Sequence, residues 1–582
     1  MTRLWNDPAD FADEMIDGFV AANARYVRRV SGGVVRTTPA PAGRVAVVVG
    51  GGSGHYPAFG GLVGAGLADG AAMGNLFASP STQQIHAVAR AAHGGGGVLF
   101  SYGNYAGDVL NFDAAQERLR AEGIACETVA VTDDIASASA DEIHRRRGIA
   151  GDLTVFRSAA GAASAGYDLA DAARVARLAN DRTRSFGVAF SGCTLPGAPA
   201  PLFSVAEGRM AIGLGIHGEP GIDEAEVPTA DGLAELLVSR LLAERPVGAD
   251  GRVVPILNGL GSLKHEEMFV VYRRIAQLLA DAGLEVIDPH VGEYCTSFDM
   301  AGTSLTLFWL DDELAELWET PVDTPAYRRG SVAPEASGRY TATTAGADAD
   351  GGEAATAIVP GDTDSQSVAR VVVEVVDTVA RTVDTHVDEL GRMDAIAGDG
   401  DHGIGMQRGS HAARAAAHES AAAGAGAATT LARAADAWSD RAGGTSGALW
   451  GVILTSVASA LGDTGRPDAA GVAAGVAAAT RGVMSYGKAE LGDKTMVDAL
   501  VPFSAQLTTA VAGGATLAEA WRSAASAASA AAAATAALLP RMGRARTHGQ
   551  HSVGTPDPGA HSLALIVTAV GDVLTHHERT PS

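Results

Sequence analysis

The sequence predicts a multidomain protein in which two α/β units are followed by an all-α helical barrel or bundle. Its 582 residues are too many for a single hydrophobic core. Before residue 330, short β-branched runs alternate with helical patterns, whereas after residue 365 apolar residues recur mainly at helical spacings. We therefore expect α/β units at 1–184 and 185–330, a flexible linker at 331–365 and a helical domain at 366–582.

The first α/β unit is predicted from short apolar runs. Arg44–Val49 (RVAVVV) has the composition of a buried strand in a parallel sheet, and it leads into the glycine-rich segment GGGSGH, Gly50–His55. Further strands are expected at Gly97–Ser101 and Thr128–Val131, with a helix at Gln83–Ala92.

The second unit is expected to start near Ser185 and to contain a helix at Val271–Ala282. Its predicted strands are Gly187–Phe190, Met210–Ile216, Val253–Leu257 and Ser304–Leu310. The segment 331–365 that follows is rich in Gly, Ala, Ser, Thr and Asp and has almost no apolar periodicity, which is typical of a linker.

The helical domain opens with an amphipathic stripe of Val368, Val372, Val375, Val379, Val383, Val387 and Leu390. Gly391 is predicted to end this helix, so that the acidic segment MDAIAGDGDHGIG (Met393–Gly405) forms a loop. Ala-rich helices are expected from there to the C-terminus, including Leu517–Leu539, which Pro540 would end.

Composition excludes several functional classes. Lys and Arg total 43 and Asp and Glu total 67, and the net charge of −24 argues against nucleic acid or an anionic membrane as a partner. The three cysteines are far apart, as in a reducing compartment. Because the polar, acidic N-terminus does not resemble a signal peptide, we expect a cytoplasmic protein.

The acidic segment is a candidate metal site. Asp394, Asp399 and Asp401 fall within eight residues and are separated by glycines, and such hard oxygen ligands suit Mg²⁺. The spacing does not fit an EF-hand, since Gly405 or Ser410 stands where a bidentate Glu is needed. Taken alone, the segment is equally compatible with an acidic surface turn between helices.

No common nucleotide-binding loop is present. The pattern G-x-G-x-x-G occurs at Gly213–Gly218, where Glu219-Pro220-Gly221 follows instead of a helix, and at Gly398–Gly403, where a helix instead of a strand precedes it. No G-x-x-x-x-G-K-[ST] segment occurs. Any nucleotide is therefore held by another kind of site.

Ten ordered motifs resemble the two domains of the dihydroxyacetone kinase family. Six resemble its ketone-binding domain, namely GGGSGH (Gly50–His55), FASPS (Phe77–Ser81), NYAGDVLNF (Asn104–Phe112), GCTLPG (Gly192–Gly197), GIHGEPG (Gly215–Gly221) and VGEYCTSFDMAG (Val291–Gly302). Four resemble its nucleotide-binding domain, namely the carboxylate segment Asp394–Asp401, GGTSGALWG (Gly443–Gly451), GDKTMVDAL (Gly492–Leu500) and GRA followed by DPGAHS (Gly543–Ala545, Asp557–Ser562). The fused arrangement is similar to the ATP-dependent members.

The resemblance implies that His217 holds the substrate. His217 lies in the tight turn Gly215–Gly221 after a predicted strand, where an imidazole can face a cavity, and a neutral imidazole nitrogen can add to a ketone carbonyl. By resemblance, the ketose is bound there as a covalent hemiaminal. A hydrogen-bonded structural histidine is the alternative.

The resemblance also implies roles for residues near the first strand. His55 and Asp108 share the acid–base work on the hydroxyl that attacks phosphorus. For Asp108, an Asx-turn or a helix cap is the alternative. The residues expected to contact the ketose are Gly52, Ser53, Gly54 and Gly103.

In the helical domain, the resemblance implies Mg²⁺ on Asp394, Asp399 and Asp401, with ATP as co-substrate. The expected nucleotide contacts are His402, Gly403, Ile404, Gly405, Thr445, Ser446, Gly487, Thr495, Met496, Asp557, Pro558 and Gly559. For GGTSG, a helix start capped by Thr445 or Ser446 is the alternative, and it is compatible with phosphate contact. An Arg near the phosphates is replaced by His551, so Arg544 or Arg546 is the candidate replacement.

Four departures from the family pattern bear on the substrate. Tyr56 and Phe59 stand where Glu and His are usual, Gly103 where Lys is usual and Asn75 where Asp is usual. These changes alter charge and volume beside the ketone site, so a four-carbon ketose such as erythrulose is an alternative to dihydroxyacetone.

We therefore expect an ATP-dependent ketose kinase that forms a homodimer and binds neither nucleic acid nor membrane. A lyase acting on a nucleotide such as FAD, and a sugar-sensing regulator without turnover, are the alternatives.

Overall fold

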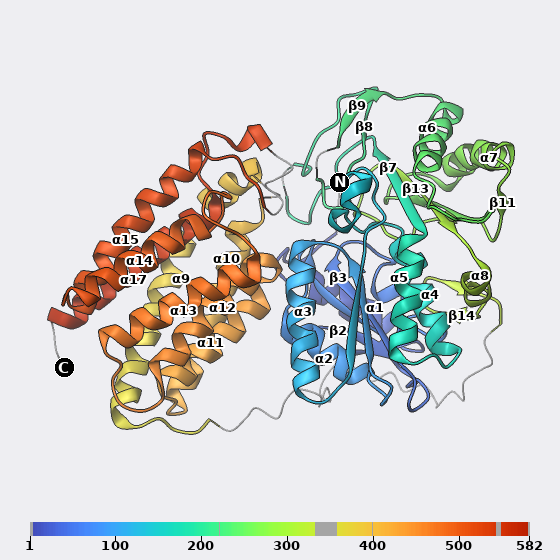
Figure 1. Ribbon diagram of the computed structural model, residues 1–582. Coiled ribbons are helices and arrows are strands. Elements are labelled where there is room, and N and C mark those ends of the chain that lie inside the picture. Colours follow the sequence, from blue (N-terminus) through green and yellow to red (C-terminus); the bar gives the residue numbers. More distant parts are fainter. Residues whose placement is uncertain are drawn as a thin grey trace. The chain divides into compact units, whose positions relative to one another are not determined.

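The computed structural model describes residues 4–198, 200–219, 221–331, 358–397, 400–542 and 549–579, and the chain divides into two compact units, Met1–Glu353 and Ala354–Ser582 (Figure 1). From here on, the first unit means Met1–Glu353, which contains both predicted α/β segments, and the second unit means Ala354–Ser582. The first unit is α/β and the second is helical, as predicted.

Six strands of the first unit form one sheet in the order β1-β2-β4-β3-β5-β6. They are β1 (Val27–Val30), β2 (Gly33–Arg36), β3 (Ala46–Ser53), β4 (Gly70–Leu76), β5 (Val98–Gly103) and β6 (Cys126–Val131). β4, β3, β5 and β6 are parallel, while β1 and β2 are antiparallel at one edge. The predicted parallel strand at Arg44–Val49 is confirmed as β3, and those at Gly97–Ser101 and Thr128–Val131 as β5 and β6.

Both faces of this sheet are covered by helices (Figure 1). Val48 packs in a core with α2 (Thr82–Ala92) and α3 (Ala106–Ala121), whereas Val47 and Val49 pack in a core with α4 (Asp152–Ser164) and α5 (Leu169–Asp181). Burial on both faces explains why β3 is apolar at successive positions instead of alternating with polar residues.

A second, mixed sheet follows in the order β11-β10-β13-β7-β8-β9, with β12 paired to β10. Its strands are β7 (Thr183–Ala189), β8 (Arg209–Ile212), β9 (Asp223–Glu226), β10 (Arg252–Gly259), β11 (Glu285–Val286), β12 (His290–Gly292) and β13 (Gly302–Trp309). Two helices, α6 (Ala230–Ala243) and α7 (His265–Asp281), cover one face. The other face joins the core around α4 and α5 and is also covered by α8 (Asp312–Trp318), so the two sheets share one core.

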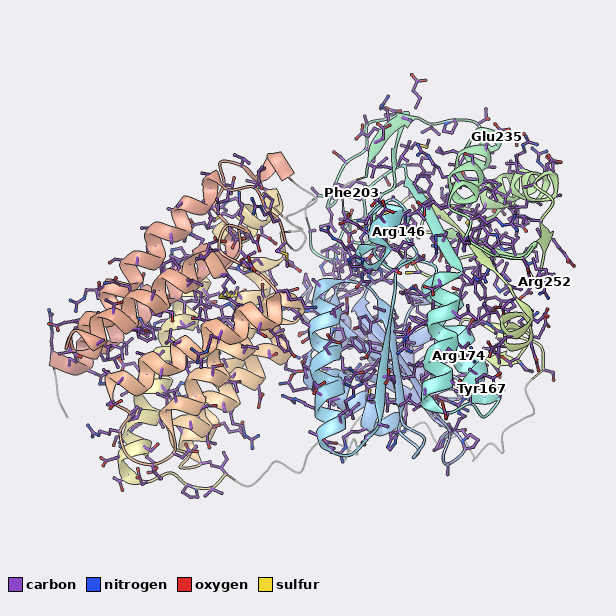
Figure 2. All side chains as sticks on the ribbon, in the orientation of Figure 1. Arg146, Tyr167, Arg174, Phe203, Glu235 and Arg252 are labelled. Atoms are coloured by element: carbon purple, nitrogen blue, oxygen red, sulfur yellow. The ribbon has the colours of Figure 1, made fainter. Side chains whose placement is uncertain are left out.

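Arg146 links the two halves of the first unit (Figure 2). It lies in the segment between β6 and α4, its side chain is fully buried, and its guanidinium donates to both carboxylate oxygens of Glu244 at 2.8 Å. Glu244 stands at the end of α6. A partly buried two-pronged Arg–carboxylate pair fixes orientation as well as distance, so it holds the segment that follows β6 against the end of α6.

Eight helices of the second unit pack in a closed ring within the described residues. They are α9 (Thr363–Ala397), α10 (His402–Ala422), α11 (Ala427–Ala442), α12 (Gly444–Leu461), α13 (Ala469–Gly487), α14 (Val497–Ala512), α15 (Leu517–Ala534) and α17 (Pro558–Arg579). Each contacts the next along the chain, and α17 contacts α9 and closes the ring. Their inward faces form one continuous core.

The prediction that Gly391 ends the first of these helices is wrong, because α9 continues to Ala397. Glycine in a helix interior costs about 1 kcal/mol relative to alanine, which helix packing can outweigh. The close approach of α10 explains the exception: a Cβ placed on Gly403 would overlap the carbonyl oxygen of Val387 and lie 3.0 Å from the backbone nitrogen of Gly391. Asp394 therefore lies on a helix instead of a loop.

Two described helices, α12 and α17, are long and apolar enough to cross a membrane by length and composition alone. Core helices of soluble proteins pass the same test, so this is weak support for a membrane span. Both contact neighbouring helices of the ring.

Candidate active site

The first group of predicted residues gathers at the carboxyl edge of the first sheet. Gly52 and Ser53 end β3, Gly103 ends β5, and Asp108 lies in the first turn of α3 just beyond β5. Parallel strands bring their carboxyl ends to one edge, where ligands of open α/β sheets bind. The sheet therefore brings together residues from two separate motifs, GGGSGH and NYAGDVLNF, and Gly103, which immediately precedes the second.

His55 and His217 meet directly although they are 162 residues apart. Their Nε2 atoms are 3.0 Å apart, and the two rings are almost perpendicular with centroids separated by 4.6 Å. Both side chains are buried, at 1% and 9% exposure. His55 comes from the loop after β3 and His217 from the turn after β8, so the pair joins the two α/β halves.

The other ring nitrogen of each histidine faces an acceptor. His55 Nδ1 is 2.8 Å from the carbonyl oxygen of Thr296, and His217 Nδ1 is 3.3 Å from Glu219 Oε1. Because a carbonyl or carboxylate oxygen can only accept, Nδ1 carries the proton in both rings. The short Nε2–Nε2 contact then requires one further proton between the rings, since two lone pairs would repel.

Glu219 holds His217 at two points. The backbone N–H of His217 donates to Glu219 Oε2 at 2.9 Å, while Nδ1–H faces Oε1. Burial by itself raises the pKa of the Glu219 carboxyl, but the charges of His217 and Arg147 and the hydrogen bonds outweigh it and hold that pKa well below its usual range. Glu219 is therefore a buried carboxylate that favours positive charge on His217.

Aromatic side chains wall the histidine pair. The Phe77 ring stacks on His55 with centroids 4.9 Å apart and meets His217 edge-on at 5.3 Å, and Tyr105 meets His217 edge-on at 4.4 Å. Phe77 has a φ of 53°, which is uncommon for a bulky residue and is held by its surroundings. Burial and the charge of Glu219 raise the pKa of Tyr105 well above its usual value, so it stays a phenol that donates to Gly148 O at 3.0 Å.

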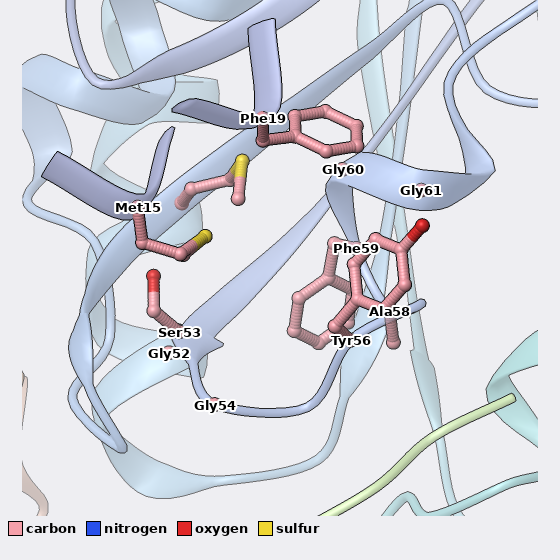
Figure 3. A pocket seen from close by; sticks show the side chains of 11 residues that line it. Met15, Phe19, Gly52, Ser53, Gly54, Tyr56, Ala58, Phe59, Gly60 and Gly61 are labelled. Atoms are coloured by element: carbon pink, nitrogen blue, oxygen red, sulfur yellow. The ribbon is translucent and has the colours of Figure 1, made fainter. Parts of the chain in front are cut away.

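The glycine-rich segment also borders a small apolar cavity (Figure 3). Gly52, Ser53 and Gly54 line it together with Met15, Phe19, Tyr56 and Phe59, among others. Its volume of about 20 Å³ holds roughly one water. It is too small for a sugar, so this cavity is not where the segment would contact a ketose.

Gly103 is closely surrounded. A Cβ placed there would lie 3.2 Å from the Gly148 carbonyl oxygen and 3.2 Å from Tyr105 Cε2, so Tyr105 and Gly148 border this position closely. Asp108 is 8% exposed in the first turn of α3, where a carboxylate also favours the helix dipole. The structure thus leaves the helix-terminal interpretation of Asp108 open beside the catalytic one.

In the second unit, the starts of α10, α12, α14 and α17 meet at one end of the ring. His402, at the start of α10, links two of the others, with Nε2 3.0 Å from Ser562 Oγ in α17 and Nδ1 3.4 Å from Ser446 Oγ in α12. Burial lowers the pKa of His402, so the bridging imidazole is neutral. A Cβ on Gly559 would lie 3.5 Å from Met496 Cβ, so the start of α14 lies beside the start of α17.

Most of the predicted nucleotide contacts lie at this end. The first turn of α10 contains Gly403, Ile404 and Gly405, and the first turn of α12 contains Thr445. α14 follows Thr495 and Met496, α17 begins at Pro558, and α13 ends at Gly487. Helix N-termini present free N–H groups and partial positive charge to anions. Asp557 also has a structural task, because its Oδ1 caps α17 by accepting from Ala560 N–H at 2.7 Å.

Two of the three predicted metal ligands can be placed. Asp394 Oδ2 accepts from the backbone N–H of His402 at 3.1 Å, and burial and the charge of Asp394 raise the pKa of Asp401 to about 7. Two hard oxygen donors that repel each other suit a divalent cation. Asp399 lies outside the described residues, as do Arg544 and Arg546, and nothing is described of the His551 side chain. Within the described part of the chain, no group of three or more His, Cys, Asp or Glu side chains is arranged to hold a metal.

Sequence reasoning missed Glu219, Tyr105, Phe77 and Arg147. The first three stand inside the motifs GIHGEPG, NYAGDVLNF and FASPS, so proximity to the predicted histidines was an available signal. Arg147, 3.9 Å from Glu219, stands outside every motif that was singled out, and nothing in its local pattern marked it.

Comparison with known proteins identifies both units. Residues 17–326 match the Dak1 domain and residues 396–572 match the DAK2 domain. The chain is 58% identical to an L-erythrulose kinase of Pectobacterium atrosepticum, over 99% of this chain and 97% of that protein, and 52% identical to a D-erythrulose kinase of Mycolicibacterium smegmatis, over 99% of each. The solved dihydroxyacetone kinase of C. freundii in complex with AMP-PNP and Mg²⁺ aligns over 98% of this chain and 99% of that one, with 29% identity and a TM-score of 0.52.

Proposed function

The chain belongs to the dihydroxyacetone kinase family, and we propose that it is an ATP-dependent kinase that phosphorylates a terminal hydroxyl of a short-chain ketose. Erythrulose is the favoured substrate and dihydroxyacetone the second, since both relatives named above as erythrulose kinases are more than half identical over nearly their full length. The observation that carries the proposal is the His55–His217 pair at 3.0 Å, with Glu219 behind His217.

The ketose would be held as a hemiaminal on His217. His217 Nε2 attacks the ketone carbon, and the carbonyl oxygen takes the proton shared with His55, so no charge is left on oxygen. The alkylated His217 ring carries the positive charge, which the carboxylate of Glu219 stabilises at 3.3 Å. Such a tether requires a carbonyl, so it rejects polyols such as glycerol.

The proton of the attacking hydroxyl then needs an acceptor. Once His55 has given up the shared proton, its Nε2 can accept one, because Nδ1 still donates to Thr296 O at 2.8 Å. Asp108, at the same edge of the sheet, is the second acceptor in the proposal. This pairing corresponds to general base catalysis during phosphoryl transfer.

In the second unit, Asp394 and Asp401, together with Asp399, would hold Mg²⁺. When bound, Mg²⁺ supplies neutralisation of phosphate charge. The helix starts around His402 would bind the nucleotide phosphates through backbone N–H groups. The support is that these starts and the two placed carboxylates lie at one end of the helical ring. We also place the protein in the cytoplasm and expect a homodimer.

The test is ADP release with a panel of three- to five-carbon ketoses, with glycerol as the negative control and FAD as the substrate of the alternative lyase reaction. A wild type that consumes ATP with erythrulose and leaves glycerol and FAD unchanged supports the proposal. A wild type that consumes ATP with none of the ketoses in the panel would overturn the proposal.

The tether has its own measurement. With a ketose labelled with ¹³C at its carbonyl, we expect the carbon signal of the bound sugar to move from the ketone region to that of a tetrahedral carbon. His217→Ala should abolish this shift and weaken sugar binding. The matched variant His265→Ala, on the exposed start of α7, should show the same shift and the same sugar affinity as the wild type. An unchanged ketone signal in the saturated wild type would exclude the covalent step.

A further inference from the structure

Asp152 is a buried carboxyl group to which the proposed mechanism assigns no task. It is the first residue of α4 and 2% exposed, and its Oδ1 has no hydrogen-bond partner among the described residues. Buried polar atoms without a partner are rare in folded proteins, and each calls for an explanation. A ligand that supplies the missing hydrogen bond is one such explanation.

A neighbouring buried carboxyl group provides the contrast. Asp133, 0% exposed, accepts from the backbone N–H groups of Ile149 and Gly151, both at 2.8 Å, so it ties down the turn before α4. Its role is structural and its bonds are made inside the protein. No such bond is made to Asp152 Oδ1 within the described chain.

The surroundings of Asp152 favour its neutral, protonated form. Burial, followed by the charges of Asp133 and Asp108, raises the pKa of Asp152 well above its usual range. A protonated carboxyl group both donates and accepts hydrogen bonds. It therefore matches a sugar hydroxyl, which does the same, better than it matches a cation.

The position of Asp152 points to the ketose site. A Cβ on Gly148 would overlap Gly103 Cα and lie 2.8 Å from Val131 O and 2.9 Å from Asp152 Oδ1, so Oδ1 lies beside Gly148, which packs directly against Gly103. Gly103 ends β5 at the edge that carries Asp108. On the other side, Gly148 O accepts from Tyr105, whose ring lies against His217 with centroids 4.4 Å apart.

We propose that Asp152 is a specificity-determining residue that hydrogen-bonds the hydroxyl of the extra carbon of a four-carbon ketose. Dihydroxyacetone lacks this group, and its complex would leave Oδ1 without a partner. The inference rests on the proposed function, because it assigns a role within the same ketose site. It adds a residue and a physical reason for choosing the longer sugar.

The test is the ratio of kcat/KM for erythrulose to that for dihydroxyacetone. Sites built to hydrogen-bond a substrate hydroxyl discriminate strongly, so Asp152→Ala should lower the erythrulose value about 100-fold or more and the dihydroxyacetone value less than about fivefold. Asp152→Thr is too short to reach the sugar and should behave like Asp152→Ala. Asp152→Asn keeps a donor and an acceptor and should largely restore the preference.

Asp133→Asn is the structural control, for which we expect lower stability and an unchanged ratio. A measurement on the wild type avoids any folding defect: 1,3-dihydroxybutan-2-one, which lacks the terminal hydroxyl of the fourth carbon, should compete with erythrulose about as weakly as dihydroxyacetone does.

Two failures can be told apart. A wild type that phosphorylates no ketose overturns the proposed function. If the wild type is active on both sugars, two results would overturn only the role of Asp152. One is an equal loss of kcat/KM for both sugars in the folded Asp152 variants, and the other is tight competition by the deoxy sugar.

Discussion

Replacing Glu219 by glutamine tests the central geometry of the ketose site. Glu219 offers two acceptor oxygens, one to the backbone N–H of His217 and one to its Nδ1–H. Glutamine has nearly the same shape but only one acceptor, so one of the two donors must face an NH₂ group. If that donor is Nδ1–H, the imidazole changes tautomer, and Nε2 gains a proton and can no longer attack a carbonyl.

The magnitude follows from these contacts. Leaving a buried donor unsatisfied costs about 1–3 kcal/mol, and the lost charge beside His217 adds about 1 kcal/mol or more. At 1.4 kcal/mol per factor of ten, these contributions predict that kcat/KM for the ketose falls about 30- to 700-fold. The corresponding amide substitution in carboxylate–histidine hydrolases lowers kcat by about 10⁴, which sets an upper bound.

The assay is coupled ADP release, with the apparent KM for ATP as an internal reference. The KM for ATP should change less than about twofold, because the predicted nucleotide contacts all lie in the second unit. Glu226→Gln, on the exposed strand β9, is the matched control and should behave as wild type. If Glu219→Gln retained more than a third of the wild-type kcat/KM, the proposed role of Glu219 in setting the His217 tautomer would be refuted.

Three further predictions concern the metal, the substrate and the stability. Asp401→Asn should reduce turnover by at least about 10³-fold, while ketose binding measured by calorimetry stays unchanged. The control Asp388→Asn, exposed on α9, should keep wild-type turnover. If Asp401→Asn kept a tenth of the activity, the metal assignment would be contradicted. Gly103→Lys should shift the kcat/KM ratio toward dihydroxyacetone, because it adds bulk and a cation beside Tyr105 and Gly148. An unchanged ratio would contradict this prediction. Burial raises the pKa of Asp133 to about 6, so its proton is bound more tightly in the folded state, and the free energy of unfolding should fall by up to about 3 kcal/mol between pH 4 and pH 6. Urea titrations should show a smaller loss in Asp133→Asn than in the wild type, because Asp152 and Asp401, whose pKa values are also raised by burial, contribute the remaining loss in both proteins.

Local pattern was sufficient for the secondary structure that carries the site. The β-branched run at Arg44–Val49 predicted β3, and the glycines after it predicted the loop that ends in His55. The valine stripe from Val368 predicted α9, because a helix with one apolar face must bury it. These conclusions depend on residues within a few turns of one another, which is the range over which periodicity and propensity act.

Tertiary structure determined which residues from those elements lie in contact. The 3.0 Å contact between His55 and His217 spans 162 residues, and it exists because two sheets pack on one core. The same applies to Gly391, where the local rule predicted a helix end and the close approach of α10 favoured a continuous helix. Residue types and spacing determined which chemical groups are present. Burial and packing between distant segments determined which of them touch and which proton each one holds, because both depend on neighbours that sequence order does not specify.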